Sequence, residues 1–462
     1  MTTVPQTTIS ISDLRAELGG HVIAPQDAEY EDARAIFYAK YDRRPAALVR
    51  PANVEDVSKV VSLARESGIE LAVRGGGHST AGHSVTEGGI VLDLSPMSAL
   101  ELDLEARTAW VEAGATAGQV TDALGAHGLA IPFGDTGSVG IGGLTLGGGI
   151  GFLVRKHGLT IDQLLAAEIV TADGETVRSD AETNPDLFWA IRGGGGNFGV
   201  VTRFQFRLQA VDQITGGMLL LPATPDAIAS FVEAADAAPE ELSAIANVMP
   251  APPMPFVPEE HHGELVIMAM LVYAGPSEDG DRALEPFRSI AAPIADLLRP
   301  MRYPEMFEPE EGDFRPLAVG RTLFLDEVDR GVAEDVLDHL RASTAQMPVV
   351  QLRVLGGALA RVPGDATAFA HRTSRIMAAV AALYATPEEG PVHTRWADDG
   401  VARLRQTDAG AYVNFLGDED EASVRAAYPG KTWDRLAELK RRYDPTNLFR
   451  LNQNIPPASA GS

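Results

Sequence analysis

The stretch Arg74-Gly-Gly-Gly-His-Ser-Thr-Ala-Gly-His-Ser84 places three consecutive glycines directly before a histidine. Because glycine has no Cβ, successive backbone N–H groups in such a run can converge on an anion such as a phosphate. Residues 70–74 have the pattern of a short strand that ends where the glycines begin. The stretch therefore predicts a strand followed by a ligand-binding loop, although one such cluster taken alone is equally well explained as a tight turn.

Two further glycine clusters follow, Gly140-Ile-Gly-Gly-Leu-Thr-Leu-Gly-Gly-Gly-Ile-Gly151 and Gly193-Gly-Gly-Gly-Asn-Phe-Gly199. Three clusters in one chain favour a large ligand that carries phosphate groups. The last cluster satisfies G-x-G-x-x-G, but a Rossmann unit requires a strand before this motif and a helix after it. Here a helix through Trp189 comes first and a strand from Val200 follows. The order excludes a Rossmann unit, and the sequence has no G-x-x-x-x-G-K-[ST] loop typical of P-loop NTPases.

The residues around the clusters alternate short apolar runs with turn signals. Asn53 is a suitable cap for an amphipathic helix that ends near Gly68. Residues 168–177 read as two strands joined at Asp173-Gly174, a strong hairpin signal, and residues 200–208 read as a strand. This part of the chain is therefore expected to be an α+β domain with glycine-rich loops.

The following residues have a different composition, with fewer glycine clusters and more Ala and Glu. Residues 224–237 and 281–298 are predicted to be helices, and residues 264–273 a strand. The pattern predicts a second domain with a sheet flanked by helices.

Composition excludes several classes of function. The 462 residues carry a formal net charge of −26, which disfavours nucleic acid and anionic membranes as partners. Cysteine is absent, so disulfides, thiolate nucleophiles and cysteine-ligated metals are excluded, and the histidines lack metal-ligand spacing. The polar start of the chain and the lack of a run of about 18 apolar residues predict a cytoplasmic protein with no membrane span.

The opening stretch resembles the flavin-attachment loop of the berberine bridge enzyme-like group, which lies in the vanillyl-alcohol oxidase/p-cresol methylhydroxylase (PCMH) superfamily. Residues 139–151 are similar to the second FAD loop of the group, and residues 184–201 to its third. Tyr412-Val-Asn-Phe415 and Asn447-Leu-Phe-Arg-Leu-Asn-Gln-Asn-Ile455 match its C-terminal motifs in the expected order.

The resemblance covers about residues 40–457 and implies an α+β fold. In this fold a two-part PCMH-type FAD-binding domain is joined to a substrate domain with an antiparallel sheet flanked by helices. The expected boundaries are an N-terminal segment 1–42 that joins the FAD domain, the FAD-binding domain 43–211, the substrate-binding domain 212–410, and a C-terminal segment 411–462 that returns to the FAD domain.

In the berberine bridge enzyme-like group, the histidine of this loop is bonded to the 8α-methyl carbon of FAD, and that role is implied for His78. Some members attach FAD a second time through a cysteine at the position of Thr136. Since the chain has no cysteine, one bond through His78 is the limit. The other residues implied to bind the cofactor are Arg74, Gly75, Gly76, Gly77, Ser79, His83, Thr136, Gly137, Val139, Gly140, Gly142, Gly143, Gly147, Gly148, Gly196, Gly199, Val200, Val201, Asn414, Asn452 and Asn454.

The resemblance also implies a catalytic base, because Tyr412 matches a motif tyrosine that lies near the flavin ring in the group. A phenol titrates near about 10, so such a base needs a nearby cation or hydrogen-bond donor; the alternative is a packed tyrosine with a satisfied hydroxyl. Some members carry a catalytic acid where this chain has Gln351 and Arg353. We expect Arg353 to face solvent or to form a surface ion pair, with binding of an anionic substrate as the alternative.

Together these observations predict an oxidase that passes hydride from a small-molecule alcohol, sugar or amine to FAD and then to O₂, giving H₂O₂. Three alternatives stay open: a dehydrogenase with another electron acceptor, an oxidative cyclase of secondary metabolism, and a flavin-binding protein without catalysis.

Overall fold

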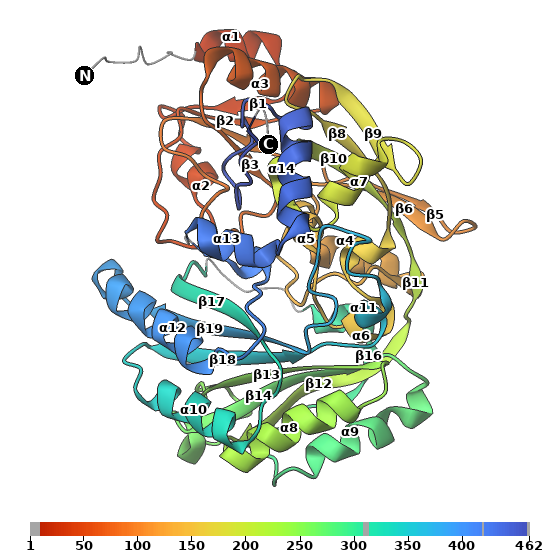
Figure 1. Ribbon diagram of the computed structural model, residues 1–462, viewed down its shortest axis with the longest axis vertical. Coiled ribbons are helices and arrows are strands. Elements are labelled where there is room, and N and C mark those ends of the chain that lie inside the picture. Colours follow the sequence, from red (N-terminus) through yellow and green to blue (C-terminus); the bar gives the residue numbers. More distant parts are fainter. Residues whose placement is uncertain (1–9, 308–313, 418–419, 460–462) are drawn as a thin grey trace.

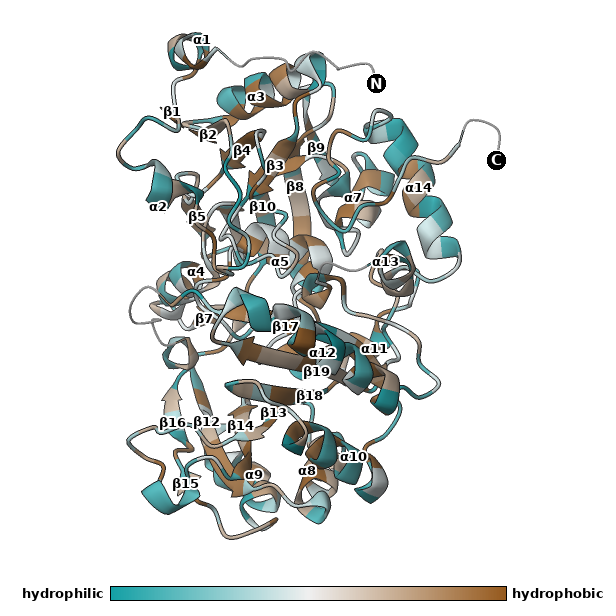
Figure 2. Cartoon of the chain, turned by 90° about the vertical axis from the view of Figure 1, so that its left-hand side faces the viewer, coloured by the Kyte–Doolittle hydropathy of each residue, from teal (hydrophilic) through white to brown (hydrophobic). Residues whose placement is uncertain are grey.

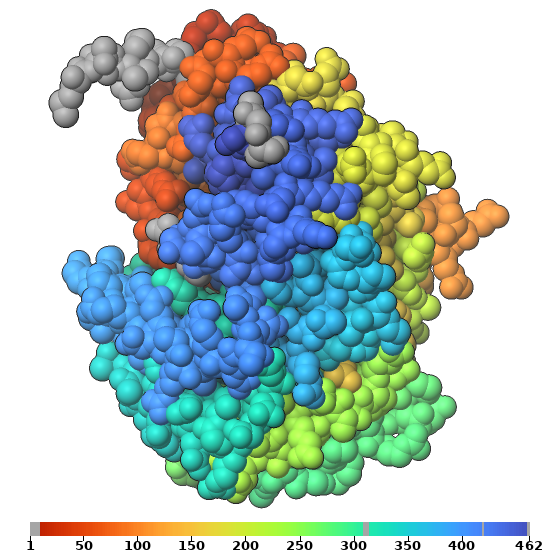
Figure 3. Space-filling model, viewed as in Figure 1, coloured from red at the N-terminus to blue at the C-terminus, as the bar shows by residue number. Residues whose placement is uncertain are grey.

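The computed structural model describes residues 10–307, 314–417 and 420–459. Two stacked parts make up the molecule, with the N-terminal elements and the last helices in one part and a large sheet in the other (Figure 1). The space-filling view shows the C-terminal segment, in blue, lying between the red and orange N-terminal elements and the yellow region around α7 (Figure 3). The α-helices are α1 (Ile11–Glu17), α2 (Tyr30–Arg34), α3 (Val54–Ser67), α4 (Ala117–Gly125), α5 (Ile141–Gly147), α6 (Val154–His157), α7 (Pro185–Ile191), α8 (Pro225–Ala237), α9 (Gly280–Arg288), α10 (Arg330–Arg341), α11 (Ala358–Arg361), α12 (Gly390–Leu404), α13 (Glu421–Ala427) and α14 (Lys431–Tyr443).

The first part contains a four-stranded mixed sheet in the order β1-β2-β4-β3. Strands β2, β4 and β3 are parallel, and β1 is antiparallel to β2. Helix α3 begins as predicted, because the side chain of Asn53 accepts a hydrogen bond from the N–H of Asp56, and it ends at the left-handed Gly68. The strands are β1 (His21–Ile23), β2 (Ala47–Arg50), β3 (Leu71–Arg74) and β4 (Ile90–Asp93).

A second sheet in the same part is antiparallel, with five strands in the order β5-β6-β10-β8-β9. The predicted hairpin at Asp173-Gly174 is confirmed, since β8 and β9 pair across this turn and Gly174 has a φ of 85°. The strands are β5 (Leu100–Asp103), β6 (Thr108–Glu112), β8 (Leu164–Val170), β9 (Thr176–Asp180) and β10 (Val200–Arg207); a short pair, β7 (Leu129–Ala130) and β11 (Gln209–Ala210), follows at the junction with the other part.

The other part is built on an eight-stranded antiparallel sheet in the order β15-β12-β14-β13-β18-β19-β17, with β16 also paired to β12. Helices α8, α9, α10 and α12 cover one face and share its apolar core. In Figure 2 the strands of this sheet are largely brown, whereas α10 and α12 carry teal on their outer surfaces. The strands are β12 (Gln213–Pro222), β13 (Leu242–Pro250), β14 (Leu265–Tyr273), β15 (Ala295–Asp296), β16 (Arg299–Arg302), β17 (Leu317–Leu325), β18 (Met347–Val354) and β19 (Ile376–Tyr384).

One predicted helix in this part is wrong over half its length. Residues 281–298 were expected to be helical throughout, but α9 ends at Arg288. Pro293 follows, and proline has neither the N–H nor the space to continue a helix. Residues 295–296 then pair with Leu219 and Leu220 of β12, so a tertiary partner decides the conformation of this stretch.

The opposite face of the large sheet turns toward the first part of the molecule. Side chains from this face, such as Ile245 and Met377, join apolar clusters with residues that follow the second glycine cluster, including Phe152 and Val154. The glycine clusters therefore meet the uncovered face of the sheet. Within the described ranges, no helix combines the length and the apolar character needed to cross a membrane.

Candidate active site

The three glycine clusters adjoin one another in space. A Cβ on Gly76 would lie 2.3 Å from the backbone nitrogen of Gly140, and a Cβ on Gly140 would lie 2.1 Å from that of Gly76. The third cluster reaches the second because the N–H of Gly193 donates to the carbonyl of Leu146 at 3.0 Å. The clusters can approach this closely only because these positions lack side chains.

The space beside the clusters fits a polar ligand that carries phosphate. A Cβ on Gly143 or on Gly196 would meet no atom within 4 Å, so both backbones border open space. Three oxygens in the neighbouring loops are buried without a hydrogen-bond partner among the described residues: Ser138 Oγ, Asn452 Oδ1 and Asn454 Oδ1. Since buried polar atoms are normally hydrogen-bonded, these side chains suit a bound group with donors and acceptors, as FAD has.

His78 lies half-buried in the loop that follows β3, with its imidazole stacked on the ring of Phe37. The ring centroids are 4.2 Å apart and the planes differ by 23°. The preceding residue, Gly77, has a φ of 74°, a left-handed conformation that favours glycine. The N–H of His83 donates to Ser79 Oγ at 3.2 Å, which closes the loop behind His78.

Arg74 lies beneath this loop, and its guanidinium is engaged by the backbone. It donates to the carbonyls of Ser84 at 3.1 Å, Ala33 at 2.5 Å and Arg34 at 3.3 Å. Burial lowers the pKa of Arg74 despite the nearby charge of Asp93. These contacts give Arg74 the role of holding the loop in place.

Tyr412 and Asn414 lie against the second glycine cluster. The Tyr412 hydroxyl is buried, with 2% of the residue exposed, and it accepts hydrogen bonds from the N–H of Gly149 at 3.0 Å and from Asn414 Nδ2 at 3.0 Å. Asn414 Nδ2 also donates to the carbonyl of Leu144 at 3.0 Å. A Cβ on Gly147 would lie 1.9 Å from Asn414 Oδ1, so the glycine permits this contact.

Two opposing effects act on the pKa of Tyr412. Burial raises the pKa of the phenol, whereas the hydrogen bonds from Gly149 and Asn414 and the charge of Arg353 lower it. The donors and the cation that a tyrosine base requires are therefore present at this hydroxyl, although burial has the larger effect on the pKa.

The expectation for Arg353 was wrong. Instead of facing solvent it is 4% exposed, and its Nη2 lies 2.6 Å from Asp135 Oδ2. Its Nε donates to Gln351 Oε1 at 2.8 Å, and Gln351 Nε2 donates in turn to Asn247 Oδ1 at 2.8 Å. Arg353 lies on the face of β18 that meets the second glycine cluster. Because that cluster is distant in the sequence, the pattern of the strand does not indicate that Arg353 is buried. Asp135 was not predicted; its only signal was its place beside Thr136, whose Oγ1 is 3.4 Å from Asp135 Oδ1.

The C-terminal segment holds the third glycine cluster. Asn197 is fully buried; its Nδ2 donates to the carbonyls of Gly194 at 2.9 Å and Gln453 at 3.1 Å, and its Oδ1 accepts from the N–H of Ile455 at 3.0 Å. Lys440 Nζ donates to the carbonyl of Asn197 at 2.8 Å. Lys440 was not singled out from the sequence, where it is one of several basic residues in an amphipathic helix.

Three further predicted residues lie at the base of the third glycine cluster. Gly199 backs onto β8, since a Cβ there would lie 2.6 Å from Ile169 Cγ2. Val200 and Val201 are buried at the start of β10, opposite Val170 and Ile169. They are therefore part of the framework from which the third cluster extends.

Comparison with known proteins assigns the family. Residues 45–180 match the family described as "FAD binding domain", and residues 411–456 match the family described as "Berberine and berberine like". The FAD-linked oxidoreductase YgaK of Bacillus subtilis is 31% identical over 458 residues, which cover 96% of this chain and 98% of that protein. The chain belongs to the berberine bridge enzyme-like FAD-linked oxidoreductases.

Other berberine bridge enzyme-like relatives align along their whole length. (R)-6-Hydroxynicotine oxidase of Paenarthrobacter nicotinovorans is 29% identical, with 95% of this chain and 97% of that protein covered. The structure of xylooligosaccharide oxidase from Myceliophthora thermophila in complex with xylobiose superposes with a TM-score of 0.85 at 25% identity, covering 98% of this chain and 100% of that one. The predicted PCMH-type fold is thereby confirmed.

The family assignment explains the two sets of contacts around the glycine clusters. The residues that match the FAD-binding family include the first two clusters. The residues that match the berberine-like family include Tyr412, Asn414 and the C-terminal residues that hydrogen-bond to Asn197. As a berberine bridge enzyme-like oxidoreductase, this protein has FAD as its cofactor, and the open space beside Gly143 and Gly196 fits that group.

Proposed function

We propose that this protein is an oxidase that holds FAD through a single covalent bond to His78 and uses Tyr412 as the base. The observation that carries the proposal is the Tyr412 hydroxyl, buried where the second glycine cluster meets the C-terminal motif and bonded to two N–H donors. A base at this point adjoins both the cofactor loops and the uncovered face of the large sheet.

FAD, when bound, supplies the two-electron chemistry by accepting a hydride from the substrate. Tyr412 takes the proton of the substrate hydroxyl or amine as that hydride leaves. The N–H of Gly149 and Asn414 Nδ2 stabilise the negative charge on the phenol oxygen, and Arg353 adds a positive field. Gly143 and Gly196 leave room for the cofactor, while Asn452 and Asn454 offer acceptor oxygens to it.

The proposed linkage is single. His78 occupies the family position for attachment, and Arg74 holds its loop through hydrogen bonds to the carbonyls of Ser84 and Ala33. Thr136 stands at the position of the second link, and a hydroxyl does not form the thioether that this link requires.

The proposed substrate is a small-molecule alcohol, sugar or amine, and the proposed electron acceptor is O₂. Relatives over the full length of the chain are named as oxidases of 6-hydroxynicotine and of xylooligosaccharides, so amines and sugars are both within the range of this framework. The neutral amides of Asn247 and Gln351 on the sheet face suit an uncharged polar substrate.

Two experiments test the proposal. Fluorescence of the denatured protein on a gel, followed by peptide mass spectrometry, should find FAD on the peptide that contains His78, and His78→Ala should abolish it. Anaerobic mixing with a panel of alcohols, sugars and amines should bleach the flavin, and air should then restore its colour with release of H₂O₂. Slow reoxidation by air with fast reduction of a dye would indicate a dehydrogenase, and no bleaching by any compound would indicate a flavin-binding protein without catalysis.

A further inference from the structure

A segment that follows α2 lies along the attachment loop and contacts it at successive points. This segment, residues 36–44, is called the brace here. The N–H of Phe37 donates to the carbonyl of Gly77 at 3.3 Å. The hydroxyl of Tyr41 donates to the carbonyl of Thr80 at 2.8 Å. The contacts therefore run in the same order along the brace and along the loop.

The end of the brace fixes the far end of the loop. Arg43 Nη1 donates to the carbonyls of Gly82 and Val85, each at 3.0 Å. Gly82 also packs on the ring of Tyr41, since a Cβ there would lie 2.5 Å from the ring carbon Cγ. The brace thus holds the loop on both sides of His78.

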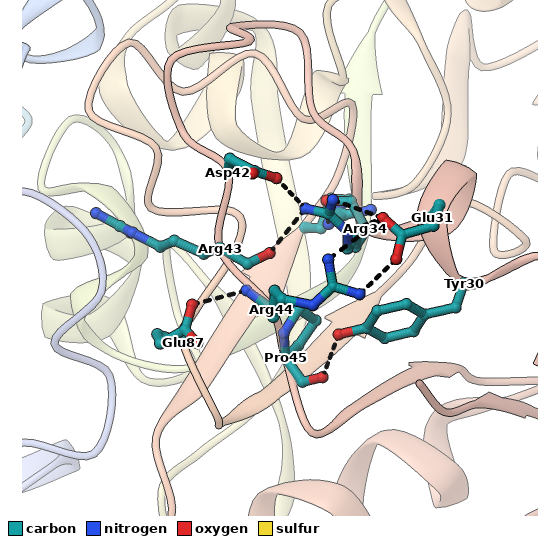
Figure 4. A network of polar contacts seen from close by, with 9 residues as sticks. Tyr30, Glu31, Arg34, Asp42, Arg43, Arg44, Pro45 and Glu87 are labelled. Atoms are coloured by element: carbon teal, nitrogen blue, oxygen red, sulfur yellow. Dashed lines mark hydrogen bonds and ion pairs between the residues drawn. The ribbon is translucent and has the colours of Figure 1, made fainter. Parts of the chain in front are cut away.

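The brace is itself fastened to α2 by a network of ion pairs (Figure 4). Arg34 forms ion pairs with Glu31 and Asp42, and Arg44 forms one with Glu31. The N–H of Arg44 donates to Glu87 at 2.8 Å, just beyond the loop. Figure 4 shows the side chain of Arg43 pointing away from this network, which leaves it to the contacts with the loop.

Among these contacts, the stack of Phe37 on His78 acts on the ring that the proposed attachment uses. The two planes are nearly parallel, and their centroids are 4.2 Å apart. A stacked neighbour covers one face of an imidazole but leaves its edge uncovered, and the reactive lone pair of a ring nitrogen lies in that edge. The stack therefore limits rotation of the ring without blocking the atom that would form a bond.

We propose that Phe37 is a positioning residue for flavin attachment, because it fixes the ring plane of His78; this rests on the proposed function, in which His78 carries the FAD. Attachment joins a ring nitrogen of His78 to the 8α carbon of FAD. The imidazole N–H proton and one 8α hydrogen end on the flavin ring, which is left reduced by two electrons. Dioxygen then takes the two electrons and two protons as H₂O₂. Phe37 contributes no atom to this step and acts only by holding the nucleophile in orientation.

The test follows the covalent fraction of the protein with time after addition of excess FAD in air, by intact mass and by fluorescence of the denatured chain. Phe37→Ala is expected to lower the rate constant for attachment by about tenfold to a hundredfold, the usual consequence of a misoriented reactive group. Phe37→Tyr keeps the stacked ring and is expected to attach FAD at the wild-type rate. Phe37→Leu keeps apolar bulk without a ring and is expected to behave like Phe37→Ala.

Two controls separate positioning from general damage. Phe314 is another aromatic neighbour of Phe37, at 6.3 Å between ring centroids and 58% exposed, and Phe314→Ala should leave attachment unchanged. In a His78→Ala background, adding Phe37→Ala should leave the Kd for reversibly bound FAD unchanged, because the stack acts on the imidazole alone.

The outcomes distinguish this inference from the proposed function. If the wild-type protein attaches no FAD, the proposed function fails at His78 whatever Phe37 does. If the wild type attaches FAD and Phe37→Ala does so at the same rate, the positioning role is overturned. Loss of FAD affinity on adding Phe37→Ala to His78→Ala would also overturn it, because Phe37 would then support the fold of the site and not the orientation of the ring.

Discussion

Lys440 and Asp444 form an ion pair that has no exposed side-chain surface, with Nζ and Oδ2 2.8 Å apart. Nζ also donates to the carbonyls of Asn197 and Phe449, each at 2.8 Å, so all three ammonium hydrogens have acceptors. Asp444 accepts in turn from the N–H of Leu448 and Phe449. This buried pair therefore ties the last helix, the tail and the third glycine cluster together.

Replacing Lys440 with Met should destabilise the protein strongly, because it leaves Asp444 buried without its cation. Breaking one side of a buried pair typically costs about 3–5 kcal/mol. Urea unfolding of the holoprotein, followed by tryptophan and flavin fluorescence, would measure the loss. Lys431→Met at the exposed start of α14 is the matched control, and an equal midpoint for the two variants would contradict the assigned role of Lys440.

Replacing Tyr412 with Phe should lower the rate of flavin reduction by about 10²–10⁴-fold, the usual contribution of a general base. Covalent flavin content should stay at the wild-type level, because the hydroxyl is not part of the attachment loop. Stopped-flow reduction by an identified substrate measures the effect. Wild-type reduction by Tyr412→Phe would assign the base to another group.

Replacing Arg353 with Gln should move the rise of the flavin-reduction rate with pH to higher pH, because Tyr412 acts as a base only after its phenol has lost the proton. The positive charge of Arg353 lowers the pKa of Tyr412 against the effect of burial, so its removal raises that pKa further. Rates of flavin reduction between pH 6 and 11 would show the shift. Asp135→Asn, which leaves Arg353 unpaired, should move this rise to lower pH. Identical profiles for all three proteins would show that the field of Arg353 does not reach the phenol.

Replacing Gly143 with Ala should weaken FAD binding without destabilising the fold. The added methyl group would meet no protein atom within 4 Å, so it projects into the space that we assign to the cofactor. The measurement is the Kd for FAD in a His78→Ala background, together with the unfolding midpoint of the flavin-free protein. Gly88→Ala is the control for the protein surface, where a Cβ also meets no atom but φ is 70°, so it should change stability and not affinity.

Stability should fall on acidification through the titration of His157. Burial, followed by the charge of Lys156, lowers the pKa of His157 to about 4. Between its ordinary pKa of 6.5 and this value the unfolded chain binds a proton that the folded chain does not, so the stabilising contribution is complete above 6.5 and is lost as the pH falls toward 4. His157→Gln should flatten the dependence of the unfolding free energy on pH over this range, and an unchanged dependence would contradict this role of His157.

Local signals in the sequence predicted the elements that local contacts decide. Asn53 and Gly68 bound α3 because a cap and a left-handed glycine act within one turn, and Asp173-Gly174 places a hairpin for the same reason. The wrong end of α9 has the opposite cause, because residues 295–296 are paired with a strand more than 70 positions earlier.

The site was predicted as a set of motifs, but not the contacts between them. Arg353 was expected at the surface because its partner, Asp135, lies 218 positions away and the pattern of β18 does not show what covers that face. Nothing in the sequence marks Lys440 as buried, because a buried lysine and an exposed one look alike in an amphipathic helix, and only the carbonyls around it distinguish them. Contacts between buried charged side chains and distant segments were therefore the main features that the sequence did not reveal.

Because the C-terminal segment bonds to the third glycine cluster, this cluster is completed late during synthesis of the chain. The glycine loops leave the ribosome first, but the groups that fasten the third loop, Lys440 and the residues up to Ile455, are translated some 240 positions later. Nascent chains fold domain by domain as they emerge, so both sheets can form before this loop is secured. The third glycine cluster therefore gains its last hydrogen bonds only after residue 455 has been translated.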